Sequence, residues 1–230
     1  MPVSNAEKHM VNKDYILRLA ERLGRFLARI IFLQEANQQE EALILIDEAF
    51  RQATGLTTGL INSLSEETLL GMLSPHGVLN VELAFYVAAL LKAEGDVYAS
   101  LDKQNESYYR HLKALNLFLE LFLRGKSIDG FDLFSNIDDL VQRLAEYELP
   151  LATNQRLFQY NEKAGRFARA EDVLFEMLGA DEVASDLIQE GMAFYHRLMA
   201  KSDDELLLGN LSREEVQESL AQVERMQRQR

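Results

Sequence analysis

The sequence predicts an all-α protein built from antiparallel helical hairpins. Apolar residues recur at spacings of three and four along nearly the whole chain of 230 residues, which is the period of an amphipathic helix. No segment alternates apolar and polar residues for long enough to indicate a β-strand. The 12 glycines and 3 prolines lie mostly between the helical segments, which favours long helices joined by short turns.

The first elements are predicted from turn and capping residues. A helix over 12–36 ends at the polar turn Asn37-Gln38-Gln39, and the next helix ends at Thr54-Gly55, where glycine favours a C-cap. Residues 55–63 are expected to form a loop. Ser65 then has the position of an N-cap, because two glutamates follow it in the first turn of a short helix.

The later elements follow the same periodicity. Further helices are expected over 81–101, 105–124, 132–148, 151–164, 167–178 and 181–200. A variable stretch over 203–210 precedes the last helix, which begins at Ser212, where Glu215 completes a capping box. The predicted organisation is a helical repeat domain over 1–200, with divergent repeats near 15–54, 82–124 and 151–178, and a linker with a C-terminal amphipathic helix over 201–230.

Three predicted hairpin turns share a pattern of small residues. The turns are placed at Asn37, Asp102 and Gly165, and five positions beyond them lie Ala42, Ser107 and Ala170. A small side chain at this point lets the second helix cross close to the first. Ala49 and Ala114 repeat the pattern seven residues further on, and Gly95 permits a close crossing before the second turn.

This pattern resembles the tetratricopeptide repeat, a helix–turn–helix unit of about 34 residues. The resemblance is best over 88–115, fair over 154–178 and weak over 23–50. The layout of 12–180, including the Leu-Ile-Asn-Ser-Leu-Ser-Glu-Glu segment from Leu60 to Glu67, is similar to uncharacterised bacterial proteins classed as tetratricopeptide-like. The resemblance implies hairpins stacked as an irregular tetratricopeptide-like right-handed solenoid.

Charge and hydropathy restrict the partners and the compartment. The formal net charge is −13, and the basic residues are interpreted as dispersed, so neither nucleic acid nor a membrane is expected as a partner. Met1 to Asp14 has no signal-peptide pattern, and no apolar run is long enough to span a bilayer. We therefore expect a soluble, cytoplasmic protein.

No motif of catalysis or metal binding is found. The sequence has no cysteine, no HExxH motif, no phosphate-binding glycine loop and no GxSxG elbow, so no metal and no cofactor are expected. His111 and His196 are interpreted as buried or partly buried structural residues of amphipathic helices. Adjacent carboxylates such as Glu66 and Glu67 point about 100° apart on a helix and make poor acid–base pairs.

The resemblance also implies where a partner would bind. Tetratricopeptide domains commonly bind extended peptides on their concave face, and the positions that correspond here are Lys92, Asp96, Gln155, Arg156, Gln159 and Lys163. Asp96 stands where members that bind chaperone tails carry Asn, which argues against that ligand. The preferred function is a non-enzymatic scaffold that binds a protein or peptide partner. The alternative is an all-α enzyme or small-ligand-binding domain whose site is assembled only in three dimensions.

The C-terminal helix has a narrow apolar stripe formed by Val216, Leu220, Val223 and Met226, and the first three are the candidate contacts for self-association. A stripe of this width is typical of a coiled-coil seam. Two interpretations remain open. The helix docks on the preceding helices, or it pairs with a second copy of the chain to form a homodimer.

Overall fold

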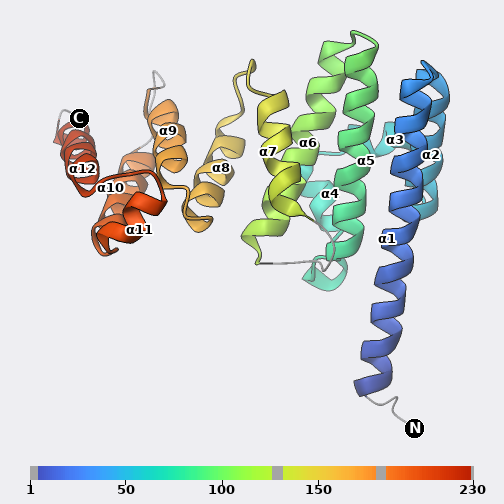
Figure 1. Cartoon of the computed structure of the whole chain (residues 1–230), viewed down its shortest axis with the longest axis horizontal. Coiled ribbons are helices and arrows are strands. Elements are labelled where there is room, and N and C mark those ends of the chain that lie inside the picture. Colours follow the sequence, from blue (N-terminus) through green and yellow to red (C-terminus); the bar gives the residue numbers. More distant parts are fainter. Residues whose placement is uncertain (1–4, 126–131, 180–184, 229–230) are drawn as a thin grey trace. The chain divides into compact units, whose positions relative to one another are not determined.

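The computed structural model describes residues 5–125, 132–179 and 185–228 (Figure 1). These residues form α-helices joined by turns and contain no strand, which confirms the all-α prediction. The chain divides into two compact units, Met1–Tyr147 and Glu148–Arg230. This division differs from the predicted boundary after residue 200, because the last two helices share a core with the helices that precede them.

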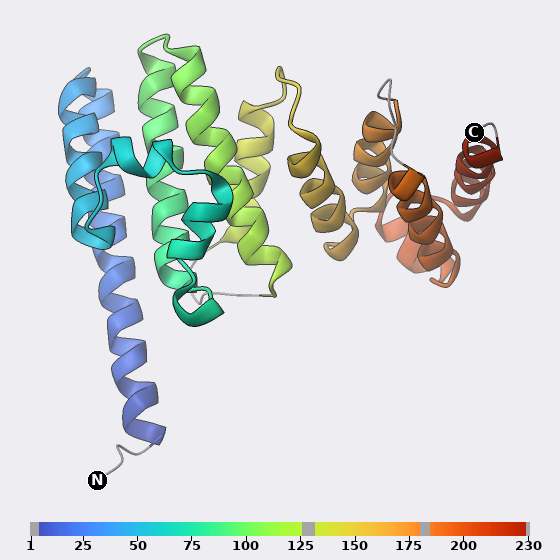
Figure 2. The ribbon, with the colours of Figure 1, turned by 180° about the vertical axis from the view of Figure 1, so that it is seen from behind.

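The first unit contains two helical hairpins and a helix that packs on the second of them. Its helices are α1 (Asn5–Glu35), α2 (Gln39–Thr54), α3 (Thr58–Ser63), α4 (Glu66–Met72), α5 (Val81–Ser100), α6 (Gln104–Leu123) and α7 (Leu133–Arg143), with a 3-10 turn η1 (Pro75–Gly77). Helices α1 and α2 pack on each other and on α5, while α7 packs on α6. The N-terminal part of α1 extends well beyond the end of α2 (Figures 1 and 2).

The hairpin turns lie where the sequence predicts them. Asn37, Asp102 and Gly165 all adopt positive φ, at 55°, 58° and 73°. The left-handed region is open to glycine and is reached by Asn and Asp more readily than by other residues. The small residues that follow these turns are buried, namely Ala42, Ala49, Ser107, Ala114 and Ala170. The predicted hairpins are therefore present, and their crossings use the predicted small side chains.

The predicted loop over 55–63 is wrong, because it contains α3. The Thr57 hydroxyl caps this helix by accepting the N–H of Leu60, and an Asp47 carboxylate oxygen on α2 accepts the N–H of Thr58 at 2.8 Å. Lys113 on α6 then donates to three carbonyl oxygens at the end of α3, those of Ile61, Asn62 and Leu64. These bonds satisfy backbone groups that a six-residue helix leaves without intrahelical partners.

A buried carboxylate joins the same segment to the second hairpin. Glu94 on α5 is fully buried, accepts hydrogen bonds from the Asn62 amide at 3.0 and 3.3 Å, and lies 3.4 Å from the Arg110 guanidinium. A buried charge is tolerated only when it is paired and hydrogen-bonded. The helices α3, α5 and α6 are thus held together by a polar contact as well as by apolar packing.

The second unit has one continuous core. Its helices are α8 (Leu151–Lys163), α9 (Phe167–Leu178), α10 (Ser185–Met199), α11 (Asp203–Leu208) and α12 (Arg213–Arg228). Helices α8 and α9 form a hairpin, and α10 packs on both α9 and α12. The predicted variable stretch over 203–210 contains α11, whose N-terminus has a capping box between Ser202 and Glu205. The helix predicted over 132–148 ends earlier, at Arg143.

Candidate functional site

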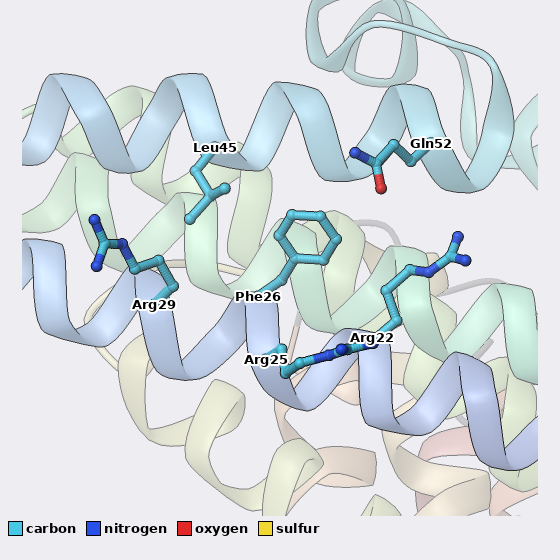
Figure 3. Close-up of a pocket in the computed structure, with 6 residues that line it drawn as sticks. All are labelled: Arg22, Arg25, Phe26, Arg29, Leu45 and Gln52. Atoms are coloured by element: carbon cyan, nitrogen blue, oxygen red, sulfur yellow. The ribbon is translucent and has the colours of Figure 1, made fainter.

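A groove in the first unit lies between α1 and α2, and half of its lining residues are arginines. Its volume is about 370 Å³, and its lining residues are Arg22, Arg25, Phe26, Arg29, Leu45 and Gln52. Figure 3 shows the Phe26 ring pointing from α1 toward α2, with Arg22 and Arg29 on either side of it. The groove therefore has an apolar floor, and the positive charge lies on its α1 side.

The helical period explains why the arginines share one face. Arg18, Arg22, Arg25 and Arg29 follow one another at spacings of four, three and four, which places them in a single row along α1. The apolar residues Leu23, Ile30 and Leu33 occupy the neighbouring face and are buried. Burial of that face fixes the rotation of α1 about its axis, so the arginine row is held at the edge of the hairpin.

The row is an exception in an acidic protein. Residues 18–34 contain four arginines and one glutamate, although the whole chain carries a net charge of −13. Neither Arg22 nor Arg25 forms an ion pair within the described part of the chain. The Arg29 guanidinium lies 5.3 Å from the centre of the Phe32 ring, in a cation–π contact. The local field of this surface is thus positive.

Several arginines elsewhere in the chain are neutralised by neighbouring carboxylates. Arg51 bonds to Asp47 at 2.7 Å, Arg124 contacts Glu120, and Arg197 contacts two glutamates. The groove arginines are exposed as these are, but they line a concave surface, and neither Arg22 nor Arg25 has a carboxylate partner among the described residues. Exposed guanidinium groups without a carboxylate partner bind carboxylates or phosphates through charge-assisted hydrogen bonds.

The groove has the chemistry of a binding site. Its lining groups are three guanidinium groups, one amide and two apolar side chains, and none of these is a nucleophile or a general base at neutral pH. The Gln52 amide donates to Glu48 at 2.9 Å, which orients it along α2. The arrangement is suited to holding an anionic group above an apolar floor.

A second cluster brings together a serine, a histidine and an aspartate. The Ser107 hydroxyl lies 3.3 Å from Nδ1 of His111, and Nε2 of His111 lies 2.9 Å from Asp96. The same residue types form the triad of serine hydrolases, in which the serine hydroxyl must reach a substrate. Here Ser107 and His111 are only 4% and 3% exposed, and Arg143 also donates to the Asp96 carboxylate at 2.8 Å. The cluster therefore acts as a packed connection between α5, α6 and α7.

Burial of His111 agrees with the prediction from its sequence position, whereas the prediction for His196 is wrong. His111 lies at the crossing of α5 and α6, and His196 is exposed on α10. The helix carrying His196 buries the adjacent residue Tyr195 instead, so the imidazole points away from the core. Among the described residues, no three His, Asp or Glu side chains are grouped in the manner of metal ligands.

The predicted groove residues of the second hairpin contact α7. Lys92 on α5 forms an ion pair with Asp139 at 2.8 Å and donates to Asn136 at 3.2 Å. Asp96 accepts a hydrogen bond from Arg143. Helix α7 thus uses both side chains to attach itself to the hairpin. A role for these two residues in binding a partner stays a prediction.

The other predicted residues lie in the second unit. Gln155, Gln159 and Lys163 are exposed on α8, and Arg156 is partly buried there. Their role in partner binding also remains a prediction. In α12, Val216 and Val223 are fully buried in the core of the unit, and Leu220 packs against its edge. This placement corresponds to the interpretation in which the C-terminal helix docks on the preceding helices. In this position the two valines are not accessible to a second copy of the chain.

The arginine groove is not among the sites predicted from the sequence. The interpretation of the basic residues as dispersed is wrong for α1, where they form a row at helical spacing. That spacing is visible in the sequence, but the contribution of Leu45 and Gln52 from α2 depends on the packing of the hairpin. None of the described helices is both long and apolar enough to cross a bilayer.

Comparison with known proteins identifies a family and no activity. No curated protein matches the chain. No solved structure matches it either. A family match covers residues 10–228 and therefore includes both units, the arginine groove and the C-terminal helix. The chain thus belongs to DUF6483, a family of unknown function.

Proposed function

We propose that this protein is a non-enzymatic helical scaffold that binds a partner protein, and that the groove between α1 and α2 receives an acidic segment of that partner. The proposal is carried by Arg22, Arg25 and Arg29, which are exposed along a concave surface of an otherwise acidic chain and have no carboxylate partner among the described residues. Charge complementarity of this kind steers association and selects the partner. The proposal includes tetratricopeptide-like stacking of the hairpins and a cytoplasmic location.

Charge favours an acidic protein segment over nucleic acid. A nucleic acid presents many phosphates, and binding to it requires a broad surface of lysines and arginines. Here the basic row is short, and the chain around it carries a net charge of −13. A short acidic segment can contact the row without approaching the rest of the negative surface. The apolar floor formed by Phe26 and Leu45 also suits a peptide better than a phosphate backbone.

The test is direct binding of a defined acidic peptide to the full chain. Fluorescence anisotropy with a labelled poly-glutamate peptide should show saturable binding that weakens as salt is raised. The triple variant Arg22→Gln/Arg25→Gln/Arg29→Gln should weaken binding by about 10- to 100-fold, as expected for the loss of three partly exposed ion pairs. The matched control Arg124→Gln/Arg225→Gln/Arg228→Gln changes the net charge equally on other helices and should bind as the wild type does.

Three outcomes contradict the proposal. If both triple variants lose binding equally, the effect comes from net charge and the groove is not the site. If a single-stranded oligonucleotide displaces the peptide and binds more tightly, the ligand is a nucleic acid. If inorganic pyrophosphate binds the groove while the peptide does not, the alternative of a small-ligand-binding domain replaces the scaffold, because the cavity of about 370 Å³ is large enough for a small anion.

A further inference from the structure

We infer that the acidic segment bound in the groove is an amphipathic α-helix, which lies along α1 and α2 with its acidic stripe on the arginines and an apolar stripe on the end of the hairpin near its turn. This inference rests on the proposed function, since it specifies the form of the ligand at the same site. It is carried by the spacing of the arginines, by the lack of backbone partners in the groove, and by apolar residues exposed on the same hairpin.

The arginines present charge at a helical repeat. Arg22, Arg25 and Arg29 are separated along the axis of α1 by about 4.5 and 6 Å, from the rise of about 1.5 Å per residue. A second helix laid along α1 reproduces these distances with acidic residues at positions i, i+3 and i+7, because its rise is the same. Side chains on one face of a β-strand are separated by about 6.6 Å. This distance is close to the spacing of about 6 Å between Arg25 and Arg29 but not to the spacing of about 4.5 Å between Arg22 and Arg25.

The groove offers little to the backbone of an extended peptide. Both walls are helices, whose backbone N–H and C=O groups are bonded within the helix, and the described residues provide no strand edge. The only side-chain amide in the lining, that of Gln52, already donates to Glu48. An extended peptide would keep its backbone groups hydrated and gain little from the groove. A helical peptide forms its backbone hydrogen bonds within the helix, so it needs to bury only side chains in the groove.

Apolar residues are exposed at the turn end of the same hairpin. Phe32 follows Arg29 in the row and is 55% exposed, and Ile44, which precedes Leu45 in the sequence of α2, is 69% exposed. The Phe32 ring lies beneath the Arg29 guanidinium, which connects the apolar end to the charged row. Exposed apolar groups rimmed by charge mark interaction sites. A helix with acidic residues toward Arg22 and leucines toward Phe32 complements both parts.

The length of the site sets the length of the ligand. From Arg22 to Phe32 the row covers about 15 Å of helix axis, or roughly three turns. A peptide of about 15 residues would cover this row with one further turn to spare. Isolated helices of that length are marginal in water, so the segment is expected to fold on binding or to belong to a folded partner.

The experiment compares peptides of equal charge that differ either in helical content or in the placement of their glutamates. The first is an alanine-rich peptide with glutamates at i, i+3 and i+7 and leucines beyond them, blocked at both ends. The second carries a central Ala→Pro change, and the third has the same composition with its glutamates scattered around the helix. We expect the first peptide to bind at least about 10-fold more tightly than the other two, which corresponds to about 1.4 kcal/mol. Circular dichroism should show a gain of helix when the first peptide is added to the protein.

A change on the protein tests the apolar end separately. The double variant Phe32→Ser/Ile44→Ser should weaken binding of the first peptide by about 10-fold and leave the poly-glutamate peptide unaffected, since that peptide has no leucines. Leu207→Ser/Leu208→Ser is the matched control, because both leucines are exposed on α11. It should change neither affinity.

The outcomes separate this inference from the proposed function. If all three peptides bind equally and depend on the groove arginines, the helical ligand is overturned and the acidic ligand stands. If the proline peptide binds more tightly than the helical one, the ligand is extended and the inference is again overturned. If no acidic peptide binds at all, the proposed function itself fails, and the inference fails with it.

Discussion

The imidazole of His111 fills the space that a side chain on Gly95 would need. A Cβ atom built on Gly95 would lie 2.4 Å from Cδ2 and 2.5 Å from Nε2 of that ring. The ring cannot turn away freely, because Ser107 contacts one of its nitrogens and Asp96 contacts the other. The close packing of α5 on α6 at this point therefore depends on the pairing of this glycine with this histidine.

Gly95→Ala should destabilise the protein by about 1–3 kcal/mol, because the added methyl group overpacks a buried helix crossing. The measurement is the free energy of unfolding in urea. Gly24→Ala in α1 is the matched control, since nothing lies within 4 Å of its Cβ position. That change should stabilise by about 0.5–1 kcal/mol, as alanine is the better helix former. Equal effects at the two positions would mean that the His111 ring moves at no cost.

The importance of Gly95 can be predicted in part from sequence. Its distance from the turn at Asp102 indicates a close crossing, and the positions of Ser107 and Ala114 indicate which face of α6 it meets. The spacing of apolar and small residues along the sequence identifies the buried face of a helix, because buried positions recur with the period of the helix. The contact with His111 is not predictable in this way, since it depends on the angle at which two helices cross, and the spacing of apolar residues does not determine that angle.

Short helices are harder to predict from the sequence than long ones. Both α3 and α11 have six residues, too few for a periodic pattern to appear, so the sequence predicts irregular segments in their place. Their caps are nevertheless present in the sequence: Thr57 accepts the N–H of Leu60, and Ser202 forms a capping box with Glu205. What makes such helices stable is contact with neighbours, as in the bonds from Lys113 to the end of α3.

Tyr86→Phe should leave stability unchanged or increase it by up to about 1 kcal/mol, because removing an unsatisfied hydroxyl removes its desolvation cost. The Tyr86 hydroxyl is buried on α5 and has no hydrogen-bond partner among the described residues. Burial raises the pKa of this phenol to about 12, against a smaller opposite effect of Arg22. Thermal unfolding of the variant is the measurement, and a clear loss of stability would indicate a partner for the hydroxyl.

Tyr195→Phe is the matched comparison, and its effect should have the opposite sign. The Tyr195 hydroxyl donates to Glu171 at 2.8 Å, and burial with this nearby carboxylate holds the pKa of the phenol far above its usual range. Loss of a hydrogen bond to a charged group should destabilise by about 1.5–3 kcal/mol. If both tyrosine variants behaved alike, the hydrogen bond to Glu171 would contribute nothing measurable.

Asp139→Asn should reduce stability at neutral pH and have no effect in strong acid. Burial alone would raise the pKa of Asp139, but hydrogen bonds from Lys92 and Arg143 outweigh it and hold the pKa below its ordinary value of 3.8. A lowered pKa means that the ionised form is favoured in the folded state. Its contribution is therefore fully present above about pH 4–5 and is lost as pH falls through the lowered folded pKa.

The measurement is the difference in unfolding free energy between wild type and variant at several pH values. The difference should be about 0.5–1 kcal/mol near pH 7, since the side chain is partly exposed, and should disappear near pH 2. Asp172→Asn, at an exposed position of α9, is the control and should change stability little. A difference that stays constant across this range would show that pairing with Lys92 and Arg143 does not depend on the charge of Asp139.

Val223→Ala and Val216→Ala should each destabilise the second unit by about 1–3 kcal/mol, through lost burial and the cavity that remains. Both valines are fully buried, and the Cγ1 atom of Val223 lies 3.5 Å from the position of a Cβ on Gly191, so α12 packs closely on α10. Gln217→Ala and Gln222→Ala, at exposed positions of the same helix, are the controls and should change stability little. Urea unfolding of the full chain measures all four.

The same burial determines what removal of the helix does. Deleting residues 211–230 removes Leu211, Val216 and Val223 from a core that they share with α10, and so exposes apolar surface of that core. We expect the truncated chain to lose the cooperative unfolding of its second unit and to aggregate, as exposed apolar surface favours association. Light scattering should show this as a rise in mass. A clean change from dimer to monomer, with the second unit still folded, would instead mean that α12 pairs with a second copy through its stripe.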